Sequence, residues 1–120
     1  MKAIIVEPDA RPRVANIQSD LVSLQEAVGG NGIEVVYPFK DAVAIVCNEE
    51  GKLLSLQPNR ALRDSNGEIY DILCGPFLVV GLAEDDFGDL TDEQVDKYMK
   101  MYHGKEMFIR KGQRIISFAV

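Results

Sequence analysis

Residues 59–81 read N-R-A-L-R-D-S-N-G-E-I-Y-D-I-L-C-G-P-F-L-V-V-G and combine a polar segment, a turn and a strand. Two arginines and a carboxylate lie in the polar segment, residues 59–64, and a turn signal follows at 65–67. The apolar run at 77–82 predicts a buried strand. Because polar groups held beside a rigid element commonly form a site, we expect a candidate site in residues 59–64 and core structure from Ile69 onward.

Short apolar runs separated by turn residues predict strands along most of the chain. The expected strands are residues 3–6, 13–17, 33–37, 42–47, 53–56, 68–73, 77–82, 107–110 and 114–120. The first two are expected to pair, as are the third and fourth in antiparallel fashion, and the last two form a hairpin around residues 111–113. The strands at 68–73 and 77–82 form either a hairpin or one bent strand.

Two helices are predicted from capping residues and apolar spacing. Asp20 is a suitable N-cap for a helix with Leu21, Leu24 and Val28 on one face, and the glycine cluster at residues 29–32 ends it. The second helix opens with a capping box made by Thr91 and Gln94. Its apolar residues recur at helical spacing, at Val95, Tyr98, Met99 and Tyr102.

These elements predict an α+β fold in one globular domain, residues 1–120, with a mixed or antiparallel curved sheet and two short amphipathic helices. At least three strands are apolar on both faces, yet two helices are available to cover them. The second face therefore needs another cover. Either the sheet curls into a partial barrel or a second copy of the chain packs against it, and we favour a homo-oligomer.

Composition excludes several classes of protein. The chain of 120 residues is 47% hydrophobic and 27% charged, as in an ordinary globular domain. Its net charge of -6 argues against direct nucleic-acid binding, which depends on Lys and Arg neutralising phosphates. No apolar stretch reaches the roughly 20 residues of a membrane span, and the N-terminus lacks the layout of a signal peptide, so we expect a cytoplasmic protein.

Signals for catalysis and metal binding are weak, and we expect no enzyme activity, catalytic residue, metal site or cofactor. Cys47 and Cys74 lie in apolar runs and are interpreted as core residues of a reduced cytosolic protein. His103 is the single histidine, and we expect it to interact with the last carbonyls of the second helix. The acidic run at residues 84–86 lacks the spacing of an EF-hand loop.

The candidate ligand-binding residues are Asn59, Arg60, Arg63, Tyr37 and Phe39. If residues 59–64 form a helical turn, both arginines lie on one side and can clamp a phosphate or carboxylate. Alternatively, they pair internally with Asp64, Glu68 or Asp71. Asn59 either binds the ligand or caps the turn. Tyr37 and Phe39 either stack on a flat ligand or pack at the edge of the sheet.

Several motifs in a fixed order resemble a known family. They are V-E-P at residues 6–8, V-Y-P-F at 36–39, C-N-E-E-G-K-L at 47–53, N-R-A-L-R-D at 59–64 and Y-D-I-L-C-G-P-F-L-V-V-G at 70–81. Together they resemble the domain of unknown function 3846 family over about residues 1–108, and residues 109–120 match least. The resemblance implies a small protein of bacteriophages, plasmids or conjugative elements. Short proteins in that setting often counter host defence or adjust host enzymes, commonly by binding, and the resemblance brings no activity or ligand with it.

We therefore expect a non-enzymatic binding module that sequesters a small anionic, nucleotide-like ligand or a host factor. The alternative is an acidic protein-interaction or DNA-mimic module that inhibits a host defence protein through residues 84–96, which carry seven carboxylates. These acids also have a structural explanation, because carboxylates near the start of a helix interact favourably with its dipole.

Overall fold

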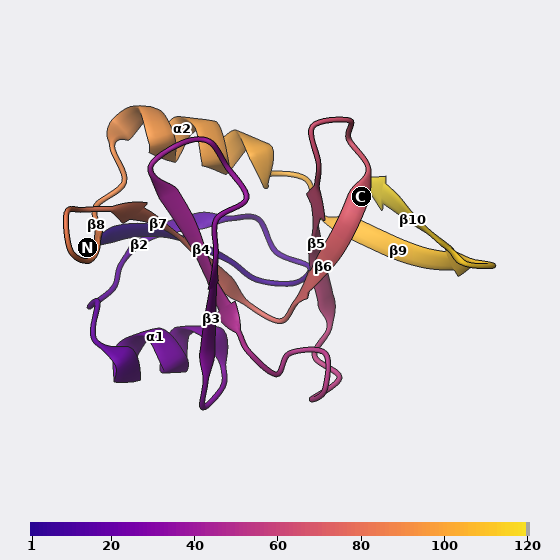
Figure 1. Cartoon of the computed structure of the whole chain (residues 1–120), viewed down its shortest axis with the longest axis horizontal. Helices are drawn as coiled ribbons and strands as arrows, with labels where there is room; N and C mark the ends of the chain where they lie inside the picture. The colour runs from indigo at the N-terminus through magenta and orange to yellow at the C-terminus, as the bar shows by residue number, and fades with distance from the viewer. Residues whose placement is uncertain (120) are drawn as a thin grey trace.

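The computed structural model of the chain describes residues 1–119 (Figure 1). Its elements, in chain order, are β1 (Lys2–Val6), β2 (Arg13–Asn16), α1 (Leu21–Val28), β3 (Ile33–Val36), β4 (Val43–Asn48), β5 (Pro58–Arg63), β6 (Ile69–Cys74), β7 (Phe77–Leu82), β8 (Phe87–Gly88), α2 (Asp92–Met101), β9 (Glu106–Lys111) and β10 (Arg114–Ala119). Of the strand expected at residues 114–120, Val120 lies outside the described residues.

The central sheet has the strand order β2-β1-β7-β4-β3, and every pair in it is antiparallel. The short strand β8, which the sequence did not indicate, pairs with the end of β7. This sheet together with the two helices confirms the α+β fold. The predicted β1–β2 and β3–β4 pairs are also confirmed. The sheet is open, so the expected partial barrel is not confirmed.

Both faces of the central sheet are covered within one chain. One face carries Ala3, Ala44, Val46, Leu78 and Val80, against which Leu24 and Val28 of α1 pack. The other face carries Ile4, Val6, Val43, Ile45 and Val79, and it is covered by Tyr98 and Tyr102 of α2, Leu62 of β5 and Leu73 of β6. The β5–β6 hairpin is thus the additional cover that the apolar strands require, and a second copy is not needed for that purpose.

The two helices begin where their capping residues predict. Asp20 accepts a hydrogen bond from the Ser23 backbone N–H, and Gly29 ends α1 with a φ of 72°. Thr91 and Gln94 form the reciprocal capping box of α2. Leu21 was expected on the apolar face of α1 but is 57% exposed, because this helix contacts the sheet through Leu24, Ala27 and Val28.

Three predictions about the middle of the chain are wrong. Residues 53–56 form turns rather than a strand, and residues 59–64 lie almost entirely in β5 rather than in a helical turn. β6 and β7 form neither a hairpin nor one bent strand, because β6 pairs with β5 whereas β7 lies between β1 and β4. Gly75, at a φ of 82°, allows the sharp change of direction that separates them.

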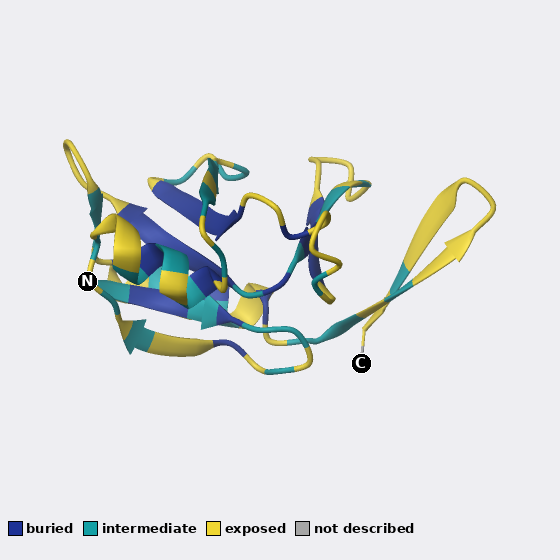
Figure 2. Cartoon of the chain, turned by 90° about the horizontal axis from the view of Figure 1, so that it is seen from below, coloured by how far each residue is buried: buried dark blue, intermediate teal, exposed yellow. Residues whose placement is uncertain are grey.

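The predicted C-terminal hairpin is present, with Gly112 at its turn, and we call residues 106–119 the arm. Figure 2 shows the arm standing out from the rest of the molecule with most of its surface exposed. It is attached at its base, where β9 lies against β5. Because it reaches away from the core, the arm creates a cleft against the β5–β6 hairpin.

Candidate functional site

Asn59 is a buried structural residue. Its side chain is 1% exposed, and its Nδ2 donates hydrogen bonds of 2.9 Å to the backbone oxygens of Val6 and Gly75. Its Oδ1 accepts a hydrogen bond of 2.7 Å from Arg60 Nη1. The amide therefore joins the end of β1 to the turn after β6, and it has no surface open to a ligand.

Arg60 is equally buried and binds backbone carbonyls. Its Nη2 donates to the oxygens of Ala10 and Tyr102, both at 2.9 Å, so the guanidinium links β5 to the β1–β2 loop and to the end of α2. Burial lowers the pKa of Arg60, and the residue makes no ion pair within residues 1–119. With 1% of its surface exposed, Arg60 holds segments together and cannot clamp a ligand from solvent.

Arg63 is the last residue of β5, and its exposed side chain is within reach of a ligand. Its Nη1 pairs with Glu106 Oε1 at 2.9 Å, and its Nη2 donates to Ser117 Oγ at 2.9 Å. The prediction that Arg63 pairs with Asp64, Glu68 or Asp71 is therefore wrong. Asp64 instead accepts backbone N–H groups of the β5–β6 turn, and Asp71 pairs with Lys52.

The two candidate aromatic residues, Tyr37 and Phe39, have different environments. Tyr37 is 63% exposed, whereas Phe39 packs against Tyr98 with ring centroids 4.8 Å apart. Phe39 and Arg63 both line a cavity of about 330 Å³ next to the end of α2, and Tyr37 is not part of its lining. The structure thus brings together two of the five predicted site residues.

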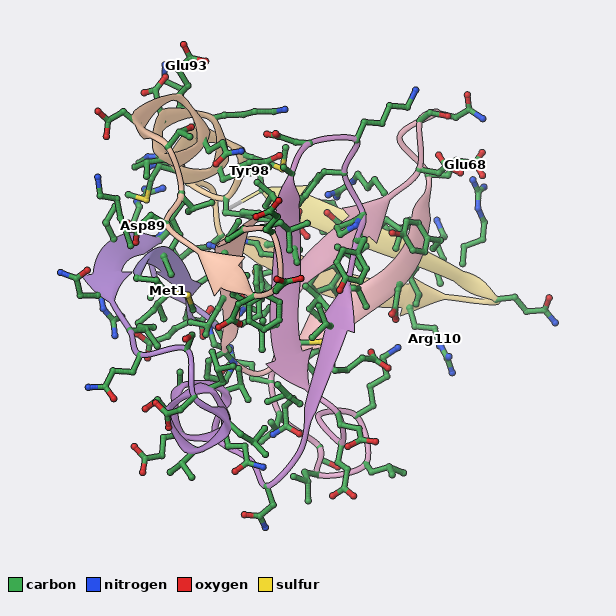
Figure 3. All side chains as sticks on the ribbon, turned by 60° about the vertical axis from the view of Figure 1, so that its left-hand side comes forward. Met1, Glu68, Asp89, Glu93, Tyr98 and Arg110 are labelled. Atoms are coloured by element: carbon green, nitrogen blue, oxygen red, sulfur yellow. The ribbon has the colours of Figure 1, made fainter. Side chains whose placement is uncertain are left out.

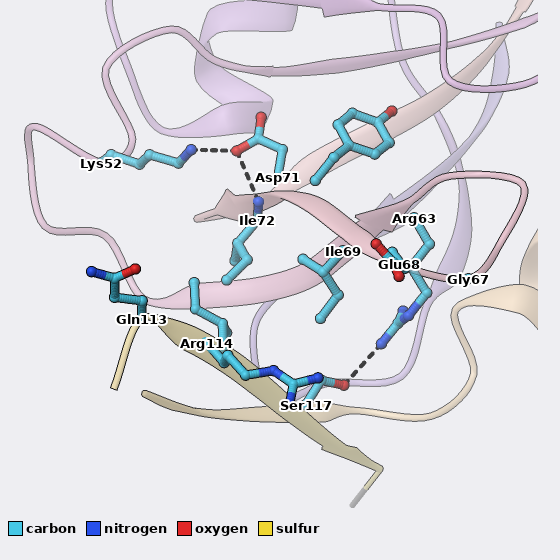
Figure 4. A pocket seen from close by; sticks show the side chains of 12 residues that line it. Lys52, Arg63, Gly67, Glu68, Ile69, Asp71, Ile72, Gln113, Arg114 and Ser117 are labelled. Carbon is cyan, nitrogen blue, oxygen red and sulfur yellow. Dashed lines mark hydrogen bonds and ion pairs between the residues drawn. The ribbon is translucent and has the colours of Figure 1, made fainter. Parts of the chain in front are cut away.

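A cleft with a volume of about 690 Å³ lies between β6 and the arm (Figure 4). Three basic side chains line it, Lys52, Arg63 and Arg114, together with Tyr70 and Ile115. Arg114 makes no ion pair with any residue that the structure describes, whereas Lys52 pairs with Asp71, which raises the pKa of Lys52. Cationic groups beside apolar and aromatic side chains suit a planar anionic ligand.

Sequence reasoning missed Lys52, Tyr70 and Arg114. They come from three separate segments, namely the β4–β5 loop, β6 and the start of β10. The basic residues after Lys97 were visible in the sequence, but their position opposite β6 depends on how the arm is placed. No local pattern encodes that placement.

Neither thiol has the character of a catalytic nucleophile. Burial raises the pKa of Cys47 to about 11 and also raises the pKa of Cys74, so both stay protonated near neutral pH. His103 is exposed after the end of α2, and its backbone oxygen accepts a hydrogen bond from Arg11. Within residues 1–119, no group of three or more His, Cys, Asp or Glu side chains is placed to hold a metal ion.

Four of the seven acids in residues 84–96 have partners within the chain. Asp86 accepts from Ser19, and Asp89 accepts a hydrogen bond of 2.6 Å from the Lys2 backbone N–H. Asp92 and Asp96 pair with lysines. Figure 3 shows Glu93 pointing outward from α2, on the opposite side from Tyr98. Much of the acidic run is thus accounted for by contacts that hold β1, α1 and α2 in place.

A family model of the domain of unknown function 3846 matches residues 1–103. Because the match covers most of the 120 residues, the chain belongs to this family. No curated protein and no solved structure matches the chain. The arm lies beyond the matched segment. Neither helix within residues 1–119 is long and apolar enough to cross a membrane.

Proposed function

We propose that the protein is a non-enzymatic binding module that holds a small anionic, nucleotide-like ligand in the cleft between β6 and the arm. The observation that carries this proposal is the position of Arg63 and Arg114 on one cleft, with Lys52 at its far end. A guanidinium is the side chain best suited to bind phosphate or carboxylate through two parallel hydrogen bonds. The raised thiol pKa values of Cys47 and Cys74 support binding rather than covalent catalysis.

The lining of the cleft supports a ligand with both an anionic and a flat part. Tyr70 is largely exposed, and Ile69 and Ile115 of the lining offer apolar contact to a ring. Glu68 and Asp71 supply acceptors for amino or hydroxyl groups. The basic residues would hold the anionic group, and Arg114 provides a guanidinium that is not already engaged in an ion pair within residues 1–119.

Calorimetry of the purified chain against a panel of nucleotides, cyclic dinucleotides included, tests the proposal. We expect binding by at least one of them, and we expect Arg114→Gln to weaken it about tenfold or more, which corresponds to about 1.4 kcal/mol. Arg13→Gln is a matched control, because Arg13 is an exposed arginine of β2 that pairs with Glu7 away from the cleft. Absence of heat with every nucleotide, or equal effects of the two substitutions, would contradict the proposal.

The acidic-surface alternative is distinguished by Asp85→Lys. Asp85 is exposed and makes no hydrogen bond within residues 1–119, whereas reversing Asp89 would also remove the contact with Lys2. Nucleotide binding in the cleft is expected to be unchanged in Asp85→Lys. A host protein captured through the acidic run would be lost in this variant and retained in Arg114→Gln.

A further inference from the structure

One face of the arm is apolar and uncovered. Alternate residues of a strand point to opposite faces, and the register places Met107 opposite Phe118 and Ile109 opposite Ile116. These four side chains therefore share one face, which we call the outer face, and each is between 37% and 55% exposed. The other face carries Ser117 and Ile115, which line the ligand cleft. Four large apolar side chains on one exposed ribbon are a docking surface.

Charge indicates which kind of surface fits there. The far end of the arm carries Arg110, Lys111 and Arg114, in a chain whose net charge is -6. Figure 3 shows Arg110 at this far end, pointing away from the central sheet. Glu106, the one carboxylate of the arm, is already paired with Arg63. An exposed apolar face that continues into a cation is complemented by a surface that combines apolar and acidic groups.

The β4–β5 loop has that combination. Leu53 is 85% exposed, the highest value among the large hydrophobic residues, and Leu54 beside it is also exposed. Glu49 and Glu50 precede them and are exposed as well. Lys52, the cation of this loop, is neutralised by Asp71. The loop therefore offers two leucines and two carboxylates to a partner.

The loop of the same chain cannot cover the outer face. Lys52 of the loop and Ile115 of the arm line the same cleft, so the loop lies across the cleft from the arm's other face. The loop and the arm both lie in the half of the molecule away from the N-terminus (Figure 1). A two-fold axis can therefore place each arm on the loop of the other copy, and the contact is then made twice.

We propose that the chain forms a two-fold dimer in which the outer face of each arm packs on the Leu53–Leu54 loop of a second copy. Lys111, which alternation places on the same face as Ile109, then meets Glu49 and Glu50 of that copy. A stable interface buries roughly 1,200 Å² or more in total, and because the contact occurs twice, each half supplies about half of this area. The added cover also stabilises a two-stranded ribbon, which is marginal by itself.

The test exchanges charges between the two surfaces and follows the oligomeric state of the full chain by sedimentation velocity. The arm variant carries Lys111→Glu, and the loop variant carries Glu49→Lys and Glu50→Lys. Each variant alone opposes like charges, so we expect its dimerisation Kd to rise about tenfold or more. An equimolar mixture of the two variants opposes unlike charges at both contacts. We expect the mixture to form heterodimers with a Kd near that of the wild type.

Further variants separate the proposal from folding defects and from ligand binding. Leu53→Ser is expected to weaken the dimer, whereas Val22→Ser, at a comparably exposed apolar position on α1, is expected not to. Far-ultraviolet circular dichroism checks that all variants remain folded. None of the three charge-exchanged residues lines the ligand cleft, so loss of the dimer and loss of nucleotide binding are independent results.

Two outcomes would overturn the inference. If the wild-type chain stays monomeric at every concentration measured by sedimentation velocity, the outer face is not covered by a second copy. Arm and loop variants that dimerise as the wild type does, or a mixture that remains monomeric, would show that this pairing of surfaces is wrong.

Discussion

At the scale of single residues, the polar pair Asn59 and Arg60 acts as a structural junction. Four chain segments are tied to β5 through these side chains: the end of β1, the β1–β2 loop, the turn after β6 and the end of α2. A buried carbonyl group without a hydrogen-bond donor destabilises the folded state. The pair is therefore required for stability even though it binds no ligand. The sequence shows that Asn59 and Arg60 are polar, and their burial in the structure makes them structural rather than ligand-binding residues.

Replacing Asn59 by Ala is expected to destabilise the protein strongly. The substitution removes the hydrogen bonds to Val6, Gly75 and Arg60, each of which contributes about 1 kcal/mol, so the free energy of unfolding should fall by about 3 kcal/mol. Urea unfolding measures the difference. Gln18→Ala, at an exposed position, is the control and should stay within about 0.5 kcal/mol of wild type. A loss no larger than that of the control would contradict the structural role of Asn59.

At the scale of elements, the Asp41 carboxylate joins α2 to the β3–β4 connection. Asp41 accepts hydrogen bonds from Gln94 at 3.1 Å and from Tyr98 at 3.1 Å. Lys97 lies 3.9 Å from the same carboxylate and also stacks over the Tyr98 ring. One side chain thereby joins a helix face to a loop that is 53 to 57 residues away in sequence.

This arrangement predicts a specific response to acid. The hydrogen bond from Gln94, followed by those from Ala42 and Tyr98 and by the charge of Lys97, lowers the pKa of Asp41 below its ordinary value of 3.8. A carboxyl whose pKa is lower in the folded state stabilises that state above its unfolded pKa, and the contribution is lost as pH falls through the folded pKa. Unfolding free energy should therefore decrease with falling pH in that range.

Urea unfolding of wild type and Asp41→Asn over about pH 5 to pH 2 measures this contribution. The two proteins should differ most at the upper end, and the difference should shrink as Asp41 of the wild type becomes protonated. Asp85→Asn is the control, because Asp85 makes no hydrogen bond within residues 1–119. A difference that is constant over this range would rule out the contribution of Asp41 ionisation.

At the scale of the whole molecule, stability is unevenly distributed. The interior strands β4 and β7 are covered on both faces, whereas the arm is a two-stranded ribbon exposed along most of its length (Figure 2). Elements with few buried apolar contacts open with less free energy than core strands. The arm is therefore the part of the molecule whose order depends most on binding, either of a ligand in the cleft or of a second copy.

Hydrogen exchange followed by mass spectrometry should reveal this difference. In dilute protein, the amides of β9 and β10 are expected to exchange much faster than those of β4 and β7. Their exchange should slow as the protein concentration rises, because the proposed dimer covers the arm. Amides of the arm that are protected as strongly as those of β7 in dilute protein would contradict the expectation.

Local sequence signals determined most of the elements and their boundaries. Asp20 and the Thr91–Gln94 capping box start the helices, and Gly67 and Gly112 adopt the positive φ angles of the two hairpin turns. Such signals act between residues a few positions apart, so they can be recognised in the sequence alone. The fold class and the β1–β2, β3–β4 and β9–β10 pairs follow from them, as does membership of the family.

Tertiary structure alone decided what the polar residues of β5 do. The middle of β5, residues 59–62, is buried on both faces and encloses Arg60, whereas Arg63 lies at the exposed end of the strand. The partner of Arg63, Glu106, lies 43 residues away, and the ligand cleft requires the arm to lie opposite β6. These contacts depend on how distant elements pack, and short-range sequence patterns do not specify that packing.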